Sequence, residues 1–285
     1  MYGKTVFSAR YGQTNSLVQS RPAPSNPDSP EQKMGTITVT LSQIAKHIDH
    51  SLLQPFMTDA EIQQGLDVSK KYGVAAACIK PYSIPQAKAA LDGSSVLVCA
   101  VIGFPHGNST TATKVYEASE AVAAGAHEID MVVNVGKVLS GEWKYVEDEI
   151  AAINSATTRG GAVLKVIFEN DFLGEEHIAR LCDVCTRVGV GFVKTSTGYG
   201  FVKQPGGDYN YRGATVPHLR LMKERCGGGV KVKAAGGVRT LDDLLFVMSL
   251  GVERIGCSAT VAIMEEARSR GITDEPTKVE LKRAE

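Results

Sequence analysis

The 285-residue chain carries no net charge and contains no long apolar run. Its 31 basic residues equal its 31 acidic residues, so no overall field attracts nucleic acid or an anionic membrane. No segment approaches the roughly 18 apolar residues of a membrane-spanning helix, and no signal-peptide core opens the chain. These absences predict a cytoplasmic protein that binds neither nucleic acid nor membranes and acts on a small molecule.

Cysteine and histidine spacings typical of metal sites are also missing. The histidines show no ligand spacing such as H-x-x-x-H, and the six cysteines are scattered, several of them inside apolar segments typical of a reduced core. Cys182 and Cys185 form a single C-x-x-C pair within a helical pattern, and no second pair is present to complete a zinc site. The sequence therefore predicts neither a metal ion nor another cofactor.

The N-terminal part of the chain differs in composition from the rest. It is rich in proline, serine, threonine and glutamine and lacks sustained periodicity, which predicts a flexible leader over residues 1–38. Residues 273–285 are predicted to form a flexible tail. The first 27 residues contain basic residues but no acid, a weak indication of organelle targeting against which the prolines argue. A plain tail and a targeting segment both stay open.

From Thr40 onward, β-rich segments alternate with helical patterns, as in successive βα units of a parallel sheet. Eight strands are predicted, at 48–52, 75–80, 96–103, 128–133, 163–168, 191–195, 230–234 and 254–257. Helices are predicted at 41–46, 59–72, 85–91, 111–124, 142–157, 175–188, 215–224, 241–250 and 260–270. Eight alternating units over residues 39–272 predict a single (β/α)8 TIM barrel.

Charged residues interrupt four of these strands, although a parallel barrel strand is normally a continuous apolar run. They are Asp130, Lys165, Lys194 and Lys233, each beside apolar residues. Buried ions are tolerable only in a mutually neutralising network. Such a network could simply fill the barrel, but active sites in this fold lie at the C-terminal ends of strands, where these residues are expected. We therefore predict an active site.

Lys194 is the predicted nucleophile. It ends an apolar strand, where desolvation favours the neutral amine, and a second ammonium from Lys233 is expected to lower its pKa further. A neutral lysine attacks carbonyl carbons to form a Schiff base. Asp130 supplies a carboxylate that can move protons through water. The alternative for Lys194 is a plain surface lysine at the end of a strand.

Glycine-rich segments follow the last two predicted strands. Gly236 and Gly237 lie in the first segment, and Gly256 and Ser258 lie in the second. Loops at these two positions of a TIM barrel often bind phosphate through backbone N–H groups and a helix N-terminus. A phosphate-bearing substrate is therefore predicted.

Five segments together resemble the deoxyribose-phosphate aldolases, which are class I aldolases that need no metal: 48–53, 128–132, 164–169, 193–198 and 233–240. The resemblance covers about residues 44–267. It implies reversible cleavage of 2-deoxy-D-ribose 5-phosphate to acetaldehyde and D-glyceraldehyde 3-phosphate, a step of deoxyribose catabolism. It also implies these roles: Lys194 as the Schiff base, Lys233 as its pKa perturbant, Asp130 in the proton relay, Asp49, Cys78, Lys165 and Thr197 in or beside the pocket, and Gly236, Gly237, Gly256 and Ser258 near the phosphate.

The chain departs from this family at three places. Ala259 stands where relatives commonly have a second serine, and the last residue is Glu285 where some members use a tyrosine in proton transfer. The segment 199–213 replaces a short glycine-rich turn and carries Lys203 and Arg212, which could supply charge to the phosphate or form a solvated surface loop.

Three other functions share parts of this pattern. An aldolase for a different sugar phosphate would have the same lysines, and a pyridoxal-phosphate enzyme would also need a Schiff-base lysine and a phosphate loop. A barrel that binds sugar phosphates without catalysis would lack one of the reactive residues. The sequence is compatible with a homodimer or a larger homo-oligomer and does not decide between them.

Overall fold

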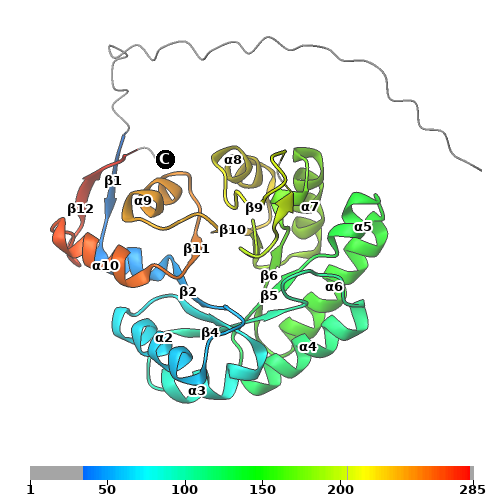
Figure 1. Cartoon of the computed structure of the whole chain (residues 1–285), viewed down its shortest axis with the longest axis horizontal. Coiled ribbons are helices and arrows are strands. Elements are labelled where there is room, and N and C mark those ends of the chain that lie inside the picture. The colour runs from blue at the N-terminus through cyan, green and yellow to red at the C-terminus, as the bar shows by residue number, and fades with distance from the viewer. Residues whose placement is uncertain (1–34, 204, 283–285) are drawn as a thin grey trace, which may run out of the picture. The chain divides into compact units, whose positions relative to one another are not determined.

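Eight parallel strands of the computed structural model close into a barrel with helices around it (Figure 1). The structure describes residues 35–203 and 205–282. The barrel strands follow one another in chain order: β2 (Ile48–Leu52), β3 (Ala76–Ile79), β4 (Leu97–Ile102), β5 (Glu128–Val132), β6 (Val163–Ile167), β7 (Phe192–Lys194), β10 (Lys231–Ala235) and β11 (Arg254–Cys257). The predicted (β/α)8 barrel is thereby confirmed.

The outer helices also match the predicted segments closely. They are α1 (Leu41–Lys46), α2 (Asp59–Tyr72), α3 (Ile84–Leu91), α4 (Thr111–Ala124), α6 (Trp143–Arg159), α7 (Glu175–Val188), α8 (Val216–Arg225), α9 (Leu241–Ser249) and α10 (Thr260–Ser269). Three short helical segments were not predicted: α5 (Val135–Leu139), η1 (Pro81–Ser83) and η2 (Asn170–Phe172). In the described part of the chain, no helix is long and apolar enough to cross a membrane.

The two faces of the barrel strands carry different residue types. All five residues of β5 are buried, yet only Ile129 and Met131 belong to the main apolar core, while Asp130 between them contacts lysines of other barrel strands. Since side chains alternate across a strand, apolar residues face the helices and polar residues face the barrel interior. The same alternation brings Lys233 inward between Val232 and Ala234. The charged residues that interrupt the apolar strands thus line the inside of the barrel.

A small antiparallel sheet lies outside the barrel. It pairs β1 (Thr36–Val39) with β12 (Thr277–Glu280). The prediction of a leader through residue 38 and a flexible tail from residue 273 is wrong for these two segments. Ile37 and Val279, which face each other in this pairing, pack against the main core and hold the sheet there. The rest of the predicted leader, residues 1–34, and the last three residues lie outside the described residues.

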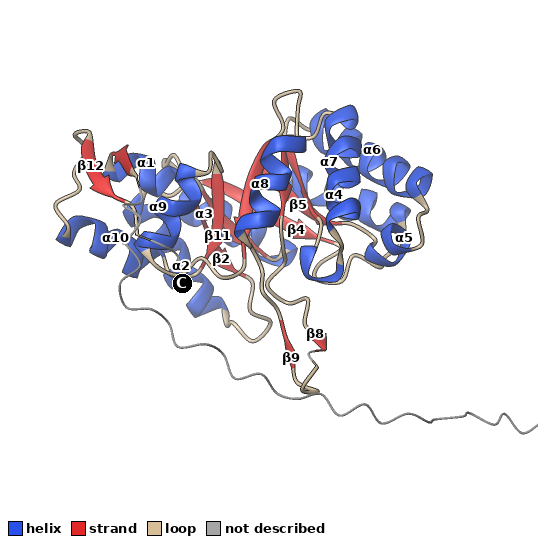
Figure 2. Cartoon of the chain, turned by 90° about the horizontal axis from the view of Figure 1, so that it is seen from above, coloured by secondary structure: helices blue, strands red, loops and turns tan. Residues whose placement is uncertain are grey.

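Within the segment 199–213, two short strands, β8 (Val202–Lys203) and β9 (Tyr209–Asn210), pair antiparallel and extend beyond the barrel (Figure 2). This strand pair is called the hairpin. Its base is held by Asp171, whose carboxylate accepts from the backbone N–H groups of Arg212 at 2.6 Å and Gly213 at 2.9 Å. The hairpin returns to the barrel beside the loop after β10, because the Ala214 N–H donates to the carbonyl of Gly236 at 2.9 Å. It therefore adjoins one of the two predicted phosphate segments.

Candidate active site

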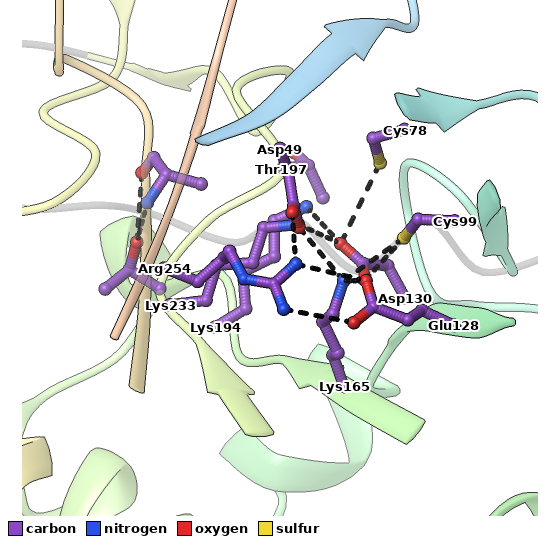
Figure 3. A network of polar contacts seen from close by, with 12 residues as sticks. Asp49, Cys78, Cys99, Glu128, Asp130, Lys165, Lys194, Thr197, Lys233 and Arg254 are labelled. Carbon is purple, nitrogen blue, oxygen red and sulfur yellow. Dashed lines mark hydrogen bonds and ion pairs between the residues drawn. The ribbon is translucent and has the colours of Figure 1, made fainter. Parts of the chain in front are cut away.

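Aspartate and lysine residues from five barrel strands form the centre of one buried polar network (Figure 3). The carboxylates of Asp49 on β2 and Asp130 on β5 face three lysines, Lys165 on β6, Lys194 on β7 and Lys233 on β10. Strand register brings the lysines together, since Lys233 is paired with Lys194 across neighbouring strands. All five residues were predicted as site residues, and the structure places all five in contact.

Asp130 is shared by all three lysines. Its Oδ2 accepts from Lys194 Nζ at 2.9 Å and from Lys233 Nζ at 2.8 Å, while its Oδ1 lies 3.2 Å from Lys165 Nζ. The Cys99 thiol also donates to Oδ1 at 3.1 Å. Asp130 therefore links the strand end that carries Lys194 to the rest of the network.

Asp49 neutralises the two lysines other than Lys194. Its Oδ2 lies 2.9 Å from Lys165 Nζ and in close contact with Lys233 Nζ, and its Oδ1 lies 2.5 Å from Arg254. Glu128 completes this part of the network, since its carboxylate contacts Lys165 at 2.5 Å and Arg254 at 3.2 Å. Lys165 and Lys233 thus each contact more than one carboxylate.

Glu128, Arg254 and Cys99 were missing from the predicted site residues. Glu128 precedes Asp130 by two positions and so lies on the same strand face, a signal that the alternation rule could have supplied. Arg254 pairs in register with Lys233 but begins its strand, where a solvated arginine is the ordinary expectation. Cys99 lies in an apolar run that gives no sign of polar contacts.

Opposite charges dominate the electrostatics of the network. Burial works to raise the pKa of Asp130, but the positive charges of Lys165 and Lys233, joined by that of Lys194 when it is protonated, outweigh it and hold the pKa well below its usual range. Burial likewise works against the charged forms of Lys165 and Lys233, yet the adjacent carboxylates raise the pKa of both. Asp130 is therefore a carboxylate at neutral pH, and Lys165 and Lys233 are ammonium ions.

A count of charges singles out Lys194. Three carboxylates, those of Asp49, Glu128 and Asp130, face three permanent cations other than Lys194. These cations are Lys165, Lys233 and Arg254. The linked groups are thus neutral before Lys194 is counted, and its protonation would add unmatched positive charge to a buried site.

Two cysteines border this network. Hydrogen bonding from Cys99 lowers the pKa of the Cys78 thiol, and the Cys78 Sγ lies 4.0 Å from Asp130 Oδ2. Two groups of three residues each hold possible metal-ligand atoms within 4.8 Å of one another. The groups are Cys78, Cys99 and Asp130, and Asp49, Cys99 and Glu128. Their carboxylates already pair with lysine or arginine, so side chains supply the positive charge here.

Thr197 lies in the loop that follows Lys194. It is 6% exposed, and its backbone N–H and hydroxyl both donate to the carboxylate of Glu169. Its hydroxyl oxygen also accepts from the Tyr199 N–H at 2.9 Å. Glu169 was not among the predicted site residues, although it lies two positions beyond Ile167 and four beyond Lys165 in the same phase.

The predicted phosphate residues lie at three places. Gly236 and Gly237 follow β10 with φ of 81° and 93°, values that favour glycine. Ser258 is exposed, just before the Ala259 N-cap of α10, where no side chain caps the helix. Gly256 lies within β11, where an added Cβ would come 3.4 Å from Lys233 Cε, so it borders the lysine network.

A cavity of about 220 Å³ opens at the C-terminal ends of β2, β3 and β4. Its walls include Leu53, Val101, Phe104 and Tyr199, and Leu53 and Val101 belong to the same small apolar cluster as Cys78 and Cys99. The rings of Phe104 and Tyr199 meet edge to face with centroids 5.5 Å apart. A larger surface groove lies between α6 and α7. None of the predicted site residues lines either the cavity or the groove.

Solved structures of aldolases share this architecture. The aldolase QR15 superimposes with a TM-score of 0.72 at 37% identity, covering 80% of this chain and 97% of that chain. A tetrameric deoxyribose phosphate aldolase from Aeropyrum pernix superimposes with a TM-score of 0.72 at 28% identity, covering 81% of this chain and 93% of that one.

Sequence comparison agrees with the structural similarity. A deoxyribose-phosphate aldolase from Rhodopirellula baltica is 47% identical over 227 residues, which are 80% of this chain and 90% of that protein. The corresponding enzyme of Caldanaerobacter subterraneus is 42% identical over 234 residues, covering 82% of this chain and 97% of the relative. The model of the DeoC/LacD family aldolases matches residues 44–256. The chain therefore belongs to the DeoC/LacD family of aldolases.

Proposed function

We propose that this protein cleaves 2-deoxy-D-ribose 5-phosphate reversibly to acetaldehyde and D-glyceraldehyde 3-phosphate through a Schiff base on Lys194. The observation that carries the proposal is the buried network in which the other cations already balance the carboxylates, so that Lys194 is the surplus amine. The relatives that match most of the chain are named for this activity.

The contacts favour Lys194 over the two neighbouring lysines as the nucleophile. Lys165 contacts Asp49, Glu128 and Asp130, and Lys233 contacts two of these carboxylates. Their raised pKa values keep both as ammonium ions, which have no free electron pair. Lys194 contacts Asp130 alone among the carboxylates of this network and ends its strand, where it meets the opening of the barrel.

The reaction begins when the neutral amine of Lys194 attacks the aldehyde carbon of the open-chain sugar. Loss of water gives an iminium ion, which accepts the electron pair of the bond between the second and third carbons as that bond breaks. The hydroxyl proton on the third carbon leaves in the same step, and D-glyceraldehyde 3-phosphate departs. Protonation of the resulting enamine and hydrolysis of the imine then release acetaldehyde and restore the amine.

Asp130 and Lys233 form the proposed proton relay. Asp130 stays ionised and can accept a proton through water, while the Lys233 ammonium at 2.8 Å can donate one to the same carboxylate oxygen. Lys233 and Lys194 contact the same oxygen of Asp130, so a permanent positive charge lies beside the proposed nucleophile. Asp49 holds Lys233 and Lys165 in place from the other side.

The substrate phosphate is proposed to bind between the loop at Gly236 and Gly237 and the start of α10 at Ser258. Support comes from the positive φ values of both glycines and from the absence of a side-chain cap on α10. The hairpin base at Arg212 adjoins the glycine loop, because an added Cβ at Gly237 would lie 3.5 Å from the Arg212 carbonyl oxygen. The hairpin is therefore a candidate to add positive charge at the phosphate.

The protein is further proposed to act as a homo-oligomer. The support is that the Aeropyrum pernix relative is described as tetrameric. Light scattering coupled to gel filtration should give a mass at least twice that of one chain, and the mass of a single chain would contradict this proposal.

The activity is tested by following D-glyceraldehyde 3-phosphate released from 2-deoxy-D-ribose 5-phosphate in a coupled assay. Lys194→Met should reduce turnover by at least about a thousandfold, because no other amine replaces the electron sink. The matched control is Lys144→Met on α6, whose lysine is 88% exposed and pairs only with Asp148, and it should keep full activity. No cleavage by the unmodified protein would refute the proposed substrate.

A further inference from the structure

Glu169 has an unusual backbone conformation beside the catalytic strand. It follows β6 with φ 60° and ψ 62°. Among the described residues, no other non-glycine residue has a positive φ. This conformation is strained for a non-glycine residue and persists only where surrounding contacts hold it. The flanking backbone supplies such contacts, because Phe168 and Asn170 donate to the carbonyls of Lys194 and Thr195, each at 2.9 Å.

The strained conformation directs a buried carboxylate at Thr197. Glu169 is 2% exposed, and both of its oxygens lie 3.2 Å from the Thr197 backbone nitrogen. The Thr197 hydroxyl donates to Oε2 of the same carboxylate. Burial raises the pKa of Glu169, and the two donors of Thr197 oppose that rise because they favour the ionised form.

These contacts fix the hydrogen-bonding polarity of the Thr197 hydroxyl. A hydroxyl has one hydrogen and two acceptor positions. The hydrogen is committed to Glu169, and one acceptor position is filled by the Tyr199 N–H at 2.9 Å. The remaining capacity of Thr197 is therefore that of an acceptor, which suits a hydroxyl group of a bound ligand.

Gly200 makes room for this arrangement. An added Cβ at Gly200 would lie 2.5 Å from the Glu169 Cδ and 2.8 Å from its Cγ. Such a contact is too short to persist, so any side chain at this position displaces the carboxylate. Three residues thus depend on one another. Glu169 orients Thr197, and Gly200 leaves room for the Glu169 side chain.

We infer that Glu169 is a positioning residue that holds the Thr197 hydroxyl as an acceptor for a hydroxyl group of the sugar phosphate. This inference rests on the proposed function, because it assumes that a hydroxylated substrate occupies the pocket beside Lys194. Glu169 does not itself touch the reacting carbons.

The test compares the full substrate with acetaldehyde, which has no hydroxyl group. In Glu169→Gln the amide can donate to the Thr197 oxygen, which fills its acceptor position and turns the hydroxyl hydrogen elsewhere. We expect kcat/KM for 2-deoxy-D-ribose 5-phosphate to fall about tenfold to hundredfold, the loss of one hydrogen bond to an oriented partner. Borohydride trapping of acetaldehyde on Lys194 should stay within about twofold of the unmodified protein, since no hydroxyl group is recognised in that reaction.

Matched variants at Thr197 show whether Glu169 acts through it. Thr197→Val keeps the shape, lacks the hydroxyl and should reproduce the selective loss, whereas Thr197→Ser should retain most of the activity. The double variant Glu169→Gln/Thr197→Val should be no more impaired than Thr197→Val alone, because the two residues act as one unit. Additive losses would contradict the inference.

Gly200→Ala gives an independent test if Glu169→Gln does not fold, because it displaces the carboxylate without removing it. It should lower kcat/KM for the sugar phosphate while acetaldehyde trapping persists. Unchanged kcat/KM, or an equal loss of trapping and cleavage, would overturn the inference and leave Glu169 as a support of the strand end. Failure of the unmodified protein to cleave the sugar phosphate would instead refute the proposed function.

Discussion

Replacing Lys233 by methionine removes one of the three permanent cations of the network and should slow imine formation at Lys194. The nitrogens of Lys194 and Lys233 contact the same oxygen of Asp130, at 2.9 Å and 2.8 Å. They can therefore be no more than about 6 Å apart, and two unit charges at that distance repel by about 3 kcal/mol at an effective dielectric constant of about 20. This energy corresponds to about a hundredfold in an equilibrium constant.

The direction of this effect depends on which form of the Lys194 side chain, the ammonium ion or the neutral amine, is destabilised by the charge of Lys233. Lys233 destabilises the ammonium form, so its removal favours protonation, and the freed charge of Asp130 acts in the same direction. The reactive neutral amine should then be rarer, and imine formation should fall by about a hundredfold.

The assay is the rate at which borohydride traps acetaldehyde on Lys194 at neutral pH, because imine formation does not need the later proton relay. Lys233→Arg is the matched control, since it keeps the charge and should keep the rate close to that of the unmodified protein. If Lys233→Met traps acetaldehyde as fast as the unmodified protein, the cation does not control the nucleophile and the electrostatic reasoning is refuted.

Three further predictions concern stability and the hairpin. Burial lowers the pKa of His50 to about 4, below its value in the unfolded chain, so the unfolded chain binds the proton first as pH falls. About 3 kcal/mol of folding stability should therefore be lost between about pH 6.5 and about pH 4. Urea titrations should show this loss in the unmodified protein but not in His50→Asn. Lys114 and Glu149 form a fully buried ion pair at 3.0 Å, so Lys114→Met should cost about 3 to 5 kcal/mol of folding stability by leaving an unpaired carboxylate. The double variant Lys114→Met/Glu149→Leu should recover most of this stability in thermal unfolding. No recovery would contradict the pairing argument. Asp171→Ala frees the base of the hairpin and should raise KM for 2-deoxy-D-ribose 5-phosphate more than for unphosphorylated deoxyribose; equal changes would show that the hairpin does not act on the phosphate.

The barrel could be predicted because its strands and helices carry strong local patterns. Segments such as 59–72 and 175–188 show helical periodicity and end before glycines, and the structure places α2 and α7 at those residues. The inward lysines and Asp130 could be predicted because each interrupts an apolar strand, and the fold itself brings such residues to one interior.

Contacts that join distant or weakly patterned segments could not be predicted. The pairing of Thr36–Val39 with Thr277–Glu280 joins the two ends of the described chain, and four residues on each side give little signal of a sheet. Arg254 stands at a strand start, where charge is ordinary, so only the closed barrel shows that it faces Asp49. The left-handed conformation of Glu169 carries no signature because the residue is not glycine.

The most direct test of the central claim identifies the residue that forms the imine. The unmodified protein is incubated with acetaldehyde, reduced with borohydride and digested, and the peptides are weighed and sequenced by mass spectrometry. The account predicts an ethyl group on Lys194 and none on Lys165 or Lys233, whose ammonium groups are held by several carboxylates. Modification of Lys165 or Lys233 with Lys194 unlabelled, or no modification at all, would contradict it.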